Sequence, residues 1–150
     1  MGKKHVIGQN QEETIKEAEK IEATLRKDVK VKVADRVSEC RVYISSSYNN
    51  TIISLTNSTG QILASKSAGA VGFKGAKKAT SFAASRVAEI ISNLCKKLAV
   101  EKIEVFIKGI GAGRESAVRT LVNQGLNIVS IKDITPIPHN GCRPRKVRRV

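Results

Sequence analysis

The last twelve residues, 139–150, carry the side chains best suited to binding chemistry. Five of them are permanently cationic and none is acidic: Arg143, Arg145, Lys146, Arg148 and Arg149. Lysine and arginine neutralise phosphates and release condensed counterions, and a segment with almost no apolar residues stays mobile until a partner orders it. The composition therefore predicts a tail that binds a polyanion. The alternative is a solvated tail that keeps the protein soluble.

The glycine pattern Gly109-x-Gly111-x-Gly113 is a second candidate for phosphate chemistry, because it stands between an expected strand and an expected helix. With Asp133 downstream, this order is close to a dinucleotide-binding fingerprint. However, Arg114 takes the place of the third fingerprint glycine, and only seventeen residues follow Asp133, too few to complete a nucleotide-binding sheet. Two interpretations remain: the backbone N–H groups and Arg114 hold a phosphate, or the glycines serve a tight strand-to-helix turn.

Other kinds of site find little support in the sequence. The three cysteines, Cys40, Cys95 and Cys142, are scattered without a CxxC pair, which argues against a disulfide framework or a zinc site. Two histidines near the termini and few acids beyond the N-terminal block suggest no acid–base pair or nucleophilic triad, so we expect no enzyme and no cofactor. Five aromatic residues are too few for a stacking platform, and we expect phosphate and shape contacts rather than bases read by stacked rings.

The charge of the chain is large and unevenly distributed. The formal net charge is +14, eight of the thirteen acids lie in residues 1–40, and from Arg41 onward eighteen lysines and arginines face five acids. Such a field attracts nucleic acid or an anionic membrane surface. No apolar run approaches the roughly 18 residues of a membrane span, and the N-terminus has no apolar stretch resembling a signal peptide. We therefore expect a cytoplasmic or comparable reducing compartment and no membrane partner.

Hydrophobic periodicity predicts the elements that must position these residues. Alternation with a period of two marks half-buried strands, apolar residues at helical spacing mark amphipathic helices, and clusters of Gly, Asn and Ser mark turns. The expected elements are strands near 37–45, 51–56 and 61–65, a flexible basic loop at 66–75, a helix at 76–98, a strand at 102–108, a helix at 114–124 and a last strand at 126–134.

The order βββαβαβ predicts an α/β fold with a mixed five-stranded sheet and two packed helices. The first three strands read as an antiparallel meander, and the helical crossover suggests parallel pairing in the second half. Val87 and Ile91 should face the sheet from the first helix and Val122 from the second, and Gly125 should end the second helix as a left-handed cap. We expect a charged, partly helical or disordered extension at 1–36, an α/β core domain at 37–134 and a basic extended tail at 135–150.

Four segments resemble the family of small-subunit ribosomal protein eleven. They are YNNTI at 48–52, GAVGFKGAKKATSFAA at 69–84, KGIGAGRESAVR at 108–119 and DITPIPHNGCRPRKVRRV at 133–150. The resemblance covers roughly residues 37–150 and is most specific in TPIPHNGCRP and GRES. The HNGCRP ending is similar to the bacterial or organellar branch of the family. The longer and more acidic extension at the N-terminus departs from the short basic arm usual in the family, so a protein neighbour is at least as plausible as RNA for that segment.

The resemblance implies a ribonuclease-H-like domain without catalytic acids that serves as a structural constituent of the small ribosomal subunit. It would bind ribosomal RNA on the platform and bridge RNA helices near the messenger exit and the Shine–Dalgarno cleft. Implied neighbours are small-subunit ribosomal proteins seven, eighteen and twenty-one, with mRNA and initiation factor three nearby. The ribosome would be that of a bacterial cytoplasm or of an organelle.

The candidate RNA-binding residues form two groups, one in the core and one in the tail. Asn140 is also a candidate for isoaspartate formation, because Gly141 leaves the following backbone nitrogen unhindered and members of the family that resemble this chain can carry isoaspartate there. The candidate set is Asn49, Asn50, Lys66, Lys74, Lys77, Lys78, Lys108 and Arg114 in the core, and His139, Asn140, Arg143, Arg145, Lys146, Arg148 and Arg149 in the tail.

Overall fold

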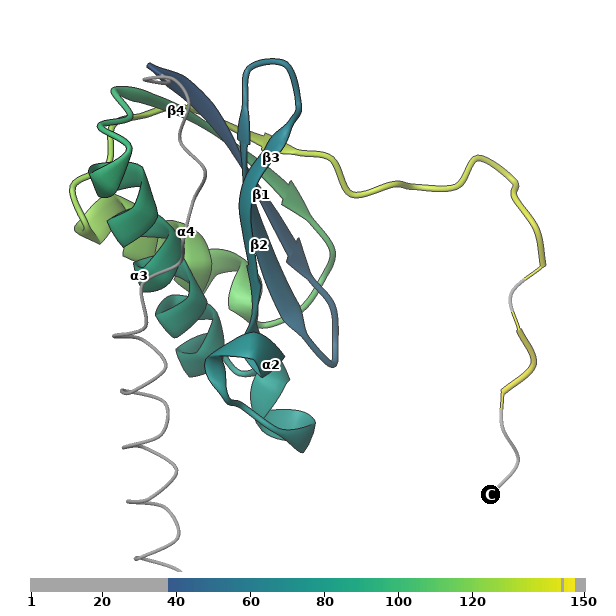
Figure 1. The fold of residues 1–150 in the computed structure, drawn as a ribbon. Coiled ribbons are helices and arrows are strands. Elements are labelled where there is room, and N and C mark those ends of the chain that lie inside the picture. The colour runs from purple at the N-terminus through teal and green to yellow at the C-terminus, as the bar shows by residue number, and fades with distance from the viewer. Residues whose placement is uncertain (1–37, 144, 148–150) are drawn as a thin grey trace, which may run out of the picture.

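A five-stranded sheet covered on one face by helices forms the domain (Figure 1). The computed structural model describes residues 38–143 and 145–147, so the expected N-terminal extension and the tail residues Arg148 and Arg149 lie outside the described residues. The elements are β1 (Glu39–Ser46), β2 (Thr51–Asn57), β3 (Ile62–Ser67), α2 (Ala68–Val71), the 3-10 helix η1 (Gly75–Ala79), α3 (Ser81–Lys97), β4 (Lys102–Lys108), α4 (Gly113–Asn123) and β5 (Ile128–Asp133).

The strand order across the sheet is β3-β2-β1-β4-β5. β1 pairs antiparallel with β2, and β2 antiparallel with β3, while β4 is parallel to both β1 and β5. The expected meander, the parallel second half and the mixed five-stranded sheet are therefore confirmed. This strand order is compatible with the ribonuclease-H-like arrangement that the resemblance implies.

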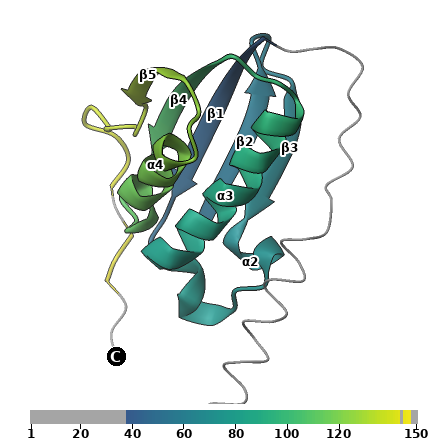
Figure 2. The same cartoon turned by 90° about the vertical axis from the view of Figure 1, so that its left-hand side faces the viewer.

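The apolar core lies between the sheet and helices α3 and α4, which stand in front of the sheet in Figure 2. Val42 and Ile44 of β1 are almost fully buried, and Val87 and Ile91 of α3 are completely so, as the helical spacing predicted. Each such side chain contributes roughly 2 kcal/mol through burial of apolar surface. Packing on the helices thus fixes which side of every strand faces inward and leaves the other face of the sheet without helices among the described residues.

The stretch 66–75 differs from the irregular loop that its glycines and lysines predicted. Its first residues complete β3, and Ala68–Val71 form the short helix α2, capped where the Ser67 hydroxyl accepts a hydrogen bond from the Ala70 backbone N–H (3.2 Å). Ala68 and Val71 are fully buried, so burial of two small apolar side chains stabilises a helical turn that local composition did not indicate. The two expected long helices are present on the sheet, and the domain has two further short helices, α2 and η1, that were not expected.

The expected helix at 76–98 also begins later than its periodicity suggested. Residues Gly75–Ala79 form the 3-10 helix η1, and α3 begins at Ser81 because Thr80 is an extended N-cap whose side chain accepts a hydrogen bond from Ala83 (3.3 Å). At the other end of the domain, Gly125 has the predicted positive φ of 77°. No helix among residues 38–143 and 145–147 is long and apolar enough to cross a membrane.

Candidate nucleic-acid interface

Four of the five strands end at the same end of the sheet. β1, β4 and β5 run parallel, and β3, which is antiparallel to β2, points the same way. Every described member of the candidate set lies in the last residues of these strands or in the segments that follow them. We call this end of the sheet the basic end; it comprises the segments 47–50, 66–78, 108–114, 134–143 and 145–147.

The segment after β3 brings three lysines to the basic end. Phe73 is 7% exposed and anchors the segment to the core, while Lys74 and Lys77 are exposed and Lys78 is half-buried. The Lys78 stem lies along α2, where its Cδ would be 3.6 Å from a β-carbon added to Gly69. The lysine-bearing segment therefore follows a fixed path, and we expect a smaller ordering cost on binding than for a mobile loop.

The turn between β1 and β2 presents the two candidate asparagines differently. Its backbone is closed by a hydrogen bond from the Ser47 N–H to the Asn50 carbonyl (2.9 Å), and the Ser47 hydroxyl accepts from the Asn50 N–H (3.1 Å). Asn49 is exposed to solvent. The Asn50 side-chain oxygen is buried, with no hydrogen-bond partner among the described residues. Asn49 is therefore the more exposed of the two candidate asparagines.

The glycine loop after β4 packs tightly against the end of β1. Gly109 has a φ of +102°, and a β-carbon there would collide with the carbonyl oxygen of Ser46. The Gly111 N–H donates to that same carbonyl (3.0 Å), and the Arg114 N–H donates to the Gly111 carbonyl (3.2 Å). A β-carbon at Gly111 would likewise collide with the carbonyl oxygen of Ser47. Glycine is therefore required at both positions by close backbone packing, as the tight-turn interpretation predicts.

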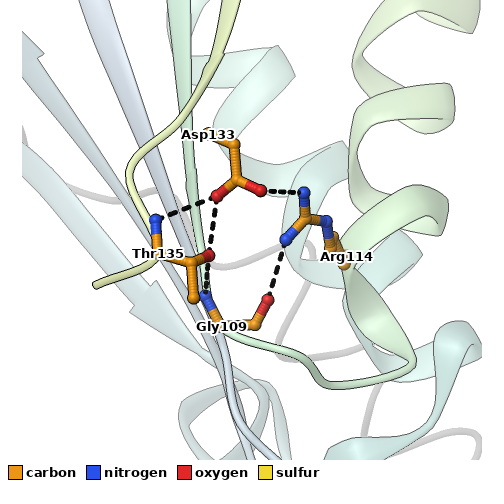
Figure 3. A network of polar contacts seen from close by, with 4 residues as sticks. All are labelled: Gly109, Arg114, Asp133 and Thr135. Atoms are coloured by element: carbon orange, nitrogen blue, oxygen red, sulfur yellow. Dashed lines mark hydrogen bonds and ion pairs between the residues drawn. The ribbon is translucent and has the colours of Figure 1, made fainter. Parts of the chain in front are cut away.

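Arg114 and Asp133 join the glycine loop to the base of the tail (Figure 3). The Arg114 guanidinium donates to the Gly109 carbonyl (3.0 Å) and pairs with the Asp133 carboxylate (2.5 Å). The other oxygen of that carboxylate accepts from the Thr135 hydroxyl (2.6 Å) and backbone N–H (2.9 Å), and the Thr135 hydroxyl oxygen accepts from the Gly109 N–H (3.0 Å). We call these four residues the clamp.

The clamp stabilises the charged form of its carboxylate. Hydrogen bonds from Thr135, followed by those from Arg114, lower the pKa of Asp133 from 3.8 to about 2. The Ile134 N–H continues the pairing with a hydrogen bond to the Ile107 carbonyl (2.8 Å). These contacts hold the candidate residue Arg114 at the point where the tail leaves the sheet, with 32% of its side chain exposed.

The tail runs clear of the domain on the side of the sheet opposite the helices (Figure 1). Residues 136–143 and 145–147 are all exposed, and none of them belongs to a helix or strand. Asn140 has a positive φ of 48°, which asparagine tolerates better than most residues. The described tail members of the candidate set are therefore fully available to a partner: His139, Asn140, Arg143, Arg145 and Lys146.

Acidic side chains are concentrated away from the basic end. Two of the described acids, Glu39 and Glu104, lie in the first halves of β1 and β4, and Glu101 directly precedes β4. Near the basic end, Glu115 pairs with Arg119 (3.5 Å) and Asp133 belongs to the clamp. The molecule is therefore electrostatically polarised along its strands, with the cationic potential at the end where the candidate residues gather.

Sequence reasoning missed one group of chemically distinctive residues, on the face of the sheet without helices. Tyr43 of β1 and Phe106 of β4 stack with ring centroids 5.0 Å apart, and the Lys132 ammonium of β5 lies 5.7 Å from the Phe106 ring. Alternation in each strand placed these residues opposite the core. Their meeting depends on the cross-strand register, which the sequence of one chain does not reveal.

Comparison with known proteins finds a matching family model and relatives about 50% identical to this chain. A family model described as Ribosomal protein S11 matches residues 40–149. A small ribosomal subunit protein uS11 from Treponema pallidum (strain Nichols) is 51% identical over 121 residues, which are 81% of this chain and 96% of the relative. A protein of the same name from Borreliella burgdorferi (strain ZS7) is 48% identical over 85% of this chain and 98% of its own length. The small ribosomal subunit protein uS11c of Chlorella vulgaris is 50% identical over 89% of this chain and 99% of its own length.

Proposed function

The chain belongs to the ribosomal protein S11 family, whose members are structural proteins of the small ribosomal subunit rather than enzymes, and we propose that it binds ribosomal RNA through its basic end. In this role the protein neutralises phosphates where RNA helices converge and holds those helices in a fixed arrangement. No bond is made or broken in this activity, so affinity and geometry are the properties to measure.

The observation that carries this proposal is the convergence of four strand ends on one cationic surface. The exposed Lys74 follows β3, Lys108 closes β4, and Arg143, Arg145 and Lys146 follow β5. A rigid core with a basic surface and an extended cationic tail suits a folded polyanion, because the core contacts one helix while the tail reaches another. Phosphate contacts of this kind supply affinity and register without reading base sequence.

The salt dependence of RNA binding tests the proposal. Each neutralised phosphate adds about 0.7 to 0.9 to the steepness of log affinity against log salt. Removing residues 139–150, which carry five cations, should therefore reduce the steepness by about 3.5 to 4.5. Lys74→Gln should lower it by about one. Lys102→Gln is the matched control, because Lys102 begins β4 at the opposite end and pairs with Glu39 (3.3 Å). An unchanged slope in the truncated chain would refute the role of the tail.

We further propose that the binding site lies on the platform of the small subunit, near the messenger exit and the Shine–Dalgarno cleft. The expected protein neighbours are small-subunit ribosomal proteins seven, eighteen and twenty-one, with mRNA and initiation factor three nearby. The organisms of the relatives, bacteria and an alga, suit a ribosome of a bacterial cytoplasm or of an organelle. Cross-linking of assembled small subunits, read by mass spectrometry, tests the neighbours, and cross-links confined to other proteins would contradict them.

Asn140 is the proposed site of isoaspartate formation. In this reaction the Gly141 backbone nitrogen attacks the Asn140 side-chain carbonyl carbon, ammonia leaves, and water opens the resulting succinimide. The proposal is supported by the exposure of Asn140, by its positive φ, and by the absence of a side chain on Gly141. Mass spectrometry of the tail peptide from assembled particles provides the test, and an unmodified asparagine there would overturn the proposal.

A further inference from the structure

One residue from each strand forms a continuous row across the face of the sheet without helices. The register pairs Ser65 of β3 with Ser54 of β2, Ser54 with Tyr43 of β1, Tyr43 with Phe106 of β4, and Phe106 with Lys132 of β5. We call these five residues the aromatic row. Because each residue is the direct cross-strand neighbour of the next, neighbouring members are separated by about 4.8 Å, the spacing of strands in a sheet.

The Tyr43 ring is covered on one side and flanked by small residues on the other. Its plane lies 14° from that of Phe106 with a centroid distance of 5.0 Å, so the two rings stand face to face above the sheet. On the far side lie Ser54 and Ser65, whose hydroxyls are 2.9 Å apart and hydrogen-bonded to each other. β3 is the edge of the sheet. The second face of the Tyr43 ring therefore borders a shallow step floored by two hydroxyl groups and open at the sheet edge.

This step has the chemistry of a site for one flat ring. An aromatic base stacked on Tyr43 would lie over Ser54, which is half-buried and whose side chain is much shorter than the Tyr43 ring. The hydroxyls of Ser54 and Ser65 can each donate and accept a hydrogen bond, which suits the polar edge of a base. Phe106 supports Tyr43 from behind, and Lys132 lies 5.7 Å from the Phe106 ring.

The charge on this face favours an anionic ligand. The two acids that the described strands place on this face are already paired, Glu39 with Lys102 (3.3 Å) and Glu104 with Arg41 (3.2 Å). Lys108, two residues after Phe106 on the same strand, and Lys132 add positive charge without an acidic partner among the described residues. The face therefore attracts a chain that combines planar rings with phosphates, which is single-stranded nucleic acid.

We propose that the aromatic row binds one unpaired base of ribosomal RNA, stacked on Tyr43 above Ser54, with Lys108 and Lys132 neutralising the adjoining phosphates. This inference rests on the proposed function, because it takes the same RNA as the ligand. It adds a second contact surface to the basic end. It differs from the expectation from the sequence that bases are not read by stacked rings.

Two pairs of variants test the stacking contact by equilibrium binding of the full chain to protein-free small-subunit ribosomal RNA from the source organism. Tyr43→Leu removes the ring and Tyr43→Phe keeps it. Ser54→Ile fills the step beside the ring and Ser54→Ala leaves it open. Loss of one stacked base corresponds to a fall in affinity of about tenfold. We therefore expect Y43L and S54I to bind about tenfold more weakly than the wild type, and Y43F and S54A to bind like it.

The salt slope separates failure of this inference from failure of the proposed function. Y43L and S54I remove no charge and should leave the slope unchanged, whereas Lys132→Gln should lower it by about one. Full affinity in both Y43L and S54I, with normal salt-dependent binding of the wild type, would overturn the stacking proposal and leave the proposed function intact. If these variants instead lost only a protein neighbour in assembled subunits, the row would be a protein contact and the proposal would again be overturned. Thermal unfolding of S54I, which leaves the stacked rings in place, confirms that a folded protein was tested.

Discussion

Replacing Gly109 with alanine tests whether the glycine loop serves packing or phosphate binding. Gly109 has a φ of +102°, and a β-carbon there would lie 2.9 Å from the carbonyl carbon of Ser46 and closer still to its oxygen. The obstacle is backbone of β1, the central strand, which cannot rotate away as a flexible side chain could. We therefore expect Gly109→Ala to destabilise the whole domain rather than to alter RNA contacts alone.

The magnitude follows from two separate costs. A non-glycine residue held at this backbone conformation costs about 1 to 3 kcal/mol, and forcing an extra carbon into a packed site costs about 1 to 3 kcal/mol more. The expected loss in the free energy of unfolding is therefore about 4 kcal/mol. Gly60 provides the matched control: its φ is +92°, but no described atom lies within 4 Å of an added β-carbon. Gly60→Ala should carry only the conformational cost, about 2 kcal/mol less than the loss at Gly109.

Urea unfolding followed by circular dichroism measures both variants against the wild type. Equal losses in Gly60→Ala and Gly109→Ala would refute the packing argument, because they would show that the close approach to Ser46 adds nothing. RNA affinity, measured where the variants remain folded, addresses the other interpretation. A large loss of RNA affinity in Gly109→Ala with little loss of stability would indicate that the loop binds phosphate directly.

Single contacts give three further predictions. Hydrogen bonds from Thr135, followed by those from Arg114, lower the pKa of Asp133 from 3.8 to about 2. The ionised carboxylate therefore stabilises the folded protein fully above about pH 3.8, and this stabilisation is lost as the pH falls toward 2. Thermal stability should decline more steeply in the wild type than in Asp133→Asn over this range, and parallel curves would contradict the clamp. Thr80→Ala, which removes the N-cap of α3, should cost about 1 kcal/mol in urea unfolding, whereas Thr80→Ser should cost little. A thiol reagent should label the exposed Cys142 in the folded protein. Cys95 should react only after unfolding, because it is buried and burial raises the pKa of its thiol to about 12. Mass spectrometry that finds labelled Cys95 in the native protein would refute this difference in reactivity.

The elements with strong periodicity could be predicted from the sequence. The strand Lys102–Lys108 has the predicted bounds, because alternating Ile, Val and Ile side chains need only one buried face. The helix expected from 76 began at Ser81 because Thr80 satisfies the first N–H groups, a capping signal that periodicity alone does not weigh. Val122 was expected to face inward but is 52% exposed, since Ala117 and Leu121 already fill the contact of α4 with the core.

The candidate site was predictable in composition but not in arrangement. Lysines and arginines can be counted in the sequence, and the strand order then determines that their segments meet at one end. The pairing of Arg114 with Asp133 joins residues 19 positions apart, and no local pattern around the glycine loop predicted it. The contact of Tyr43 with Phe106 depends on a parallel register between distant strands. Long-range register arises from the packing of the whole domain, which no local pattern encodes.

The central position of β1 has a consequence for the synthesis of the chain. β2 follows β1 directly in the sequence, so these two strands can pair soon after they are synthesised. The other neighbour of β1 is β4, whose residues come 63 positions after their partners in β1, as in the pair Glu39 and Lys102. Chains are synthesised at about 5 to 20 residues per second, so the second edge of β1 stays unpaired for roughly 3 to 13 s. During that time an apolar strand edge is open to pairing with other nascent chains. The cationic tail is synthesised last, so the growing chain is exposed to aggregation before it can bind RNA with all of its cations. A chaperone that binds the open edge of β1 early should therefore raise the yield of folded protein.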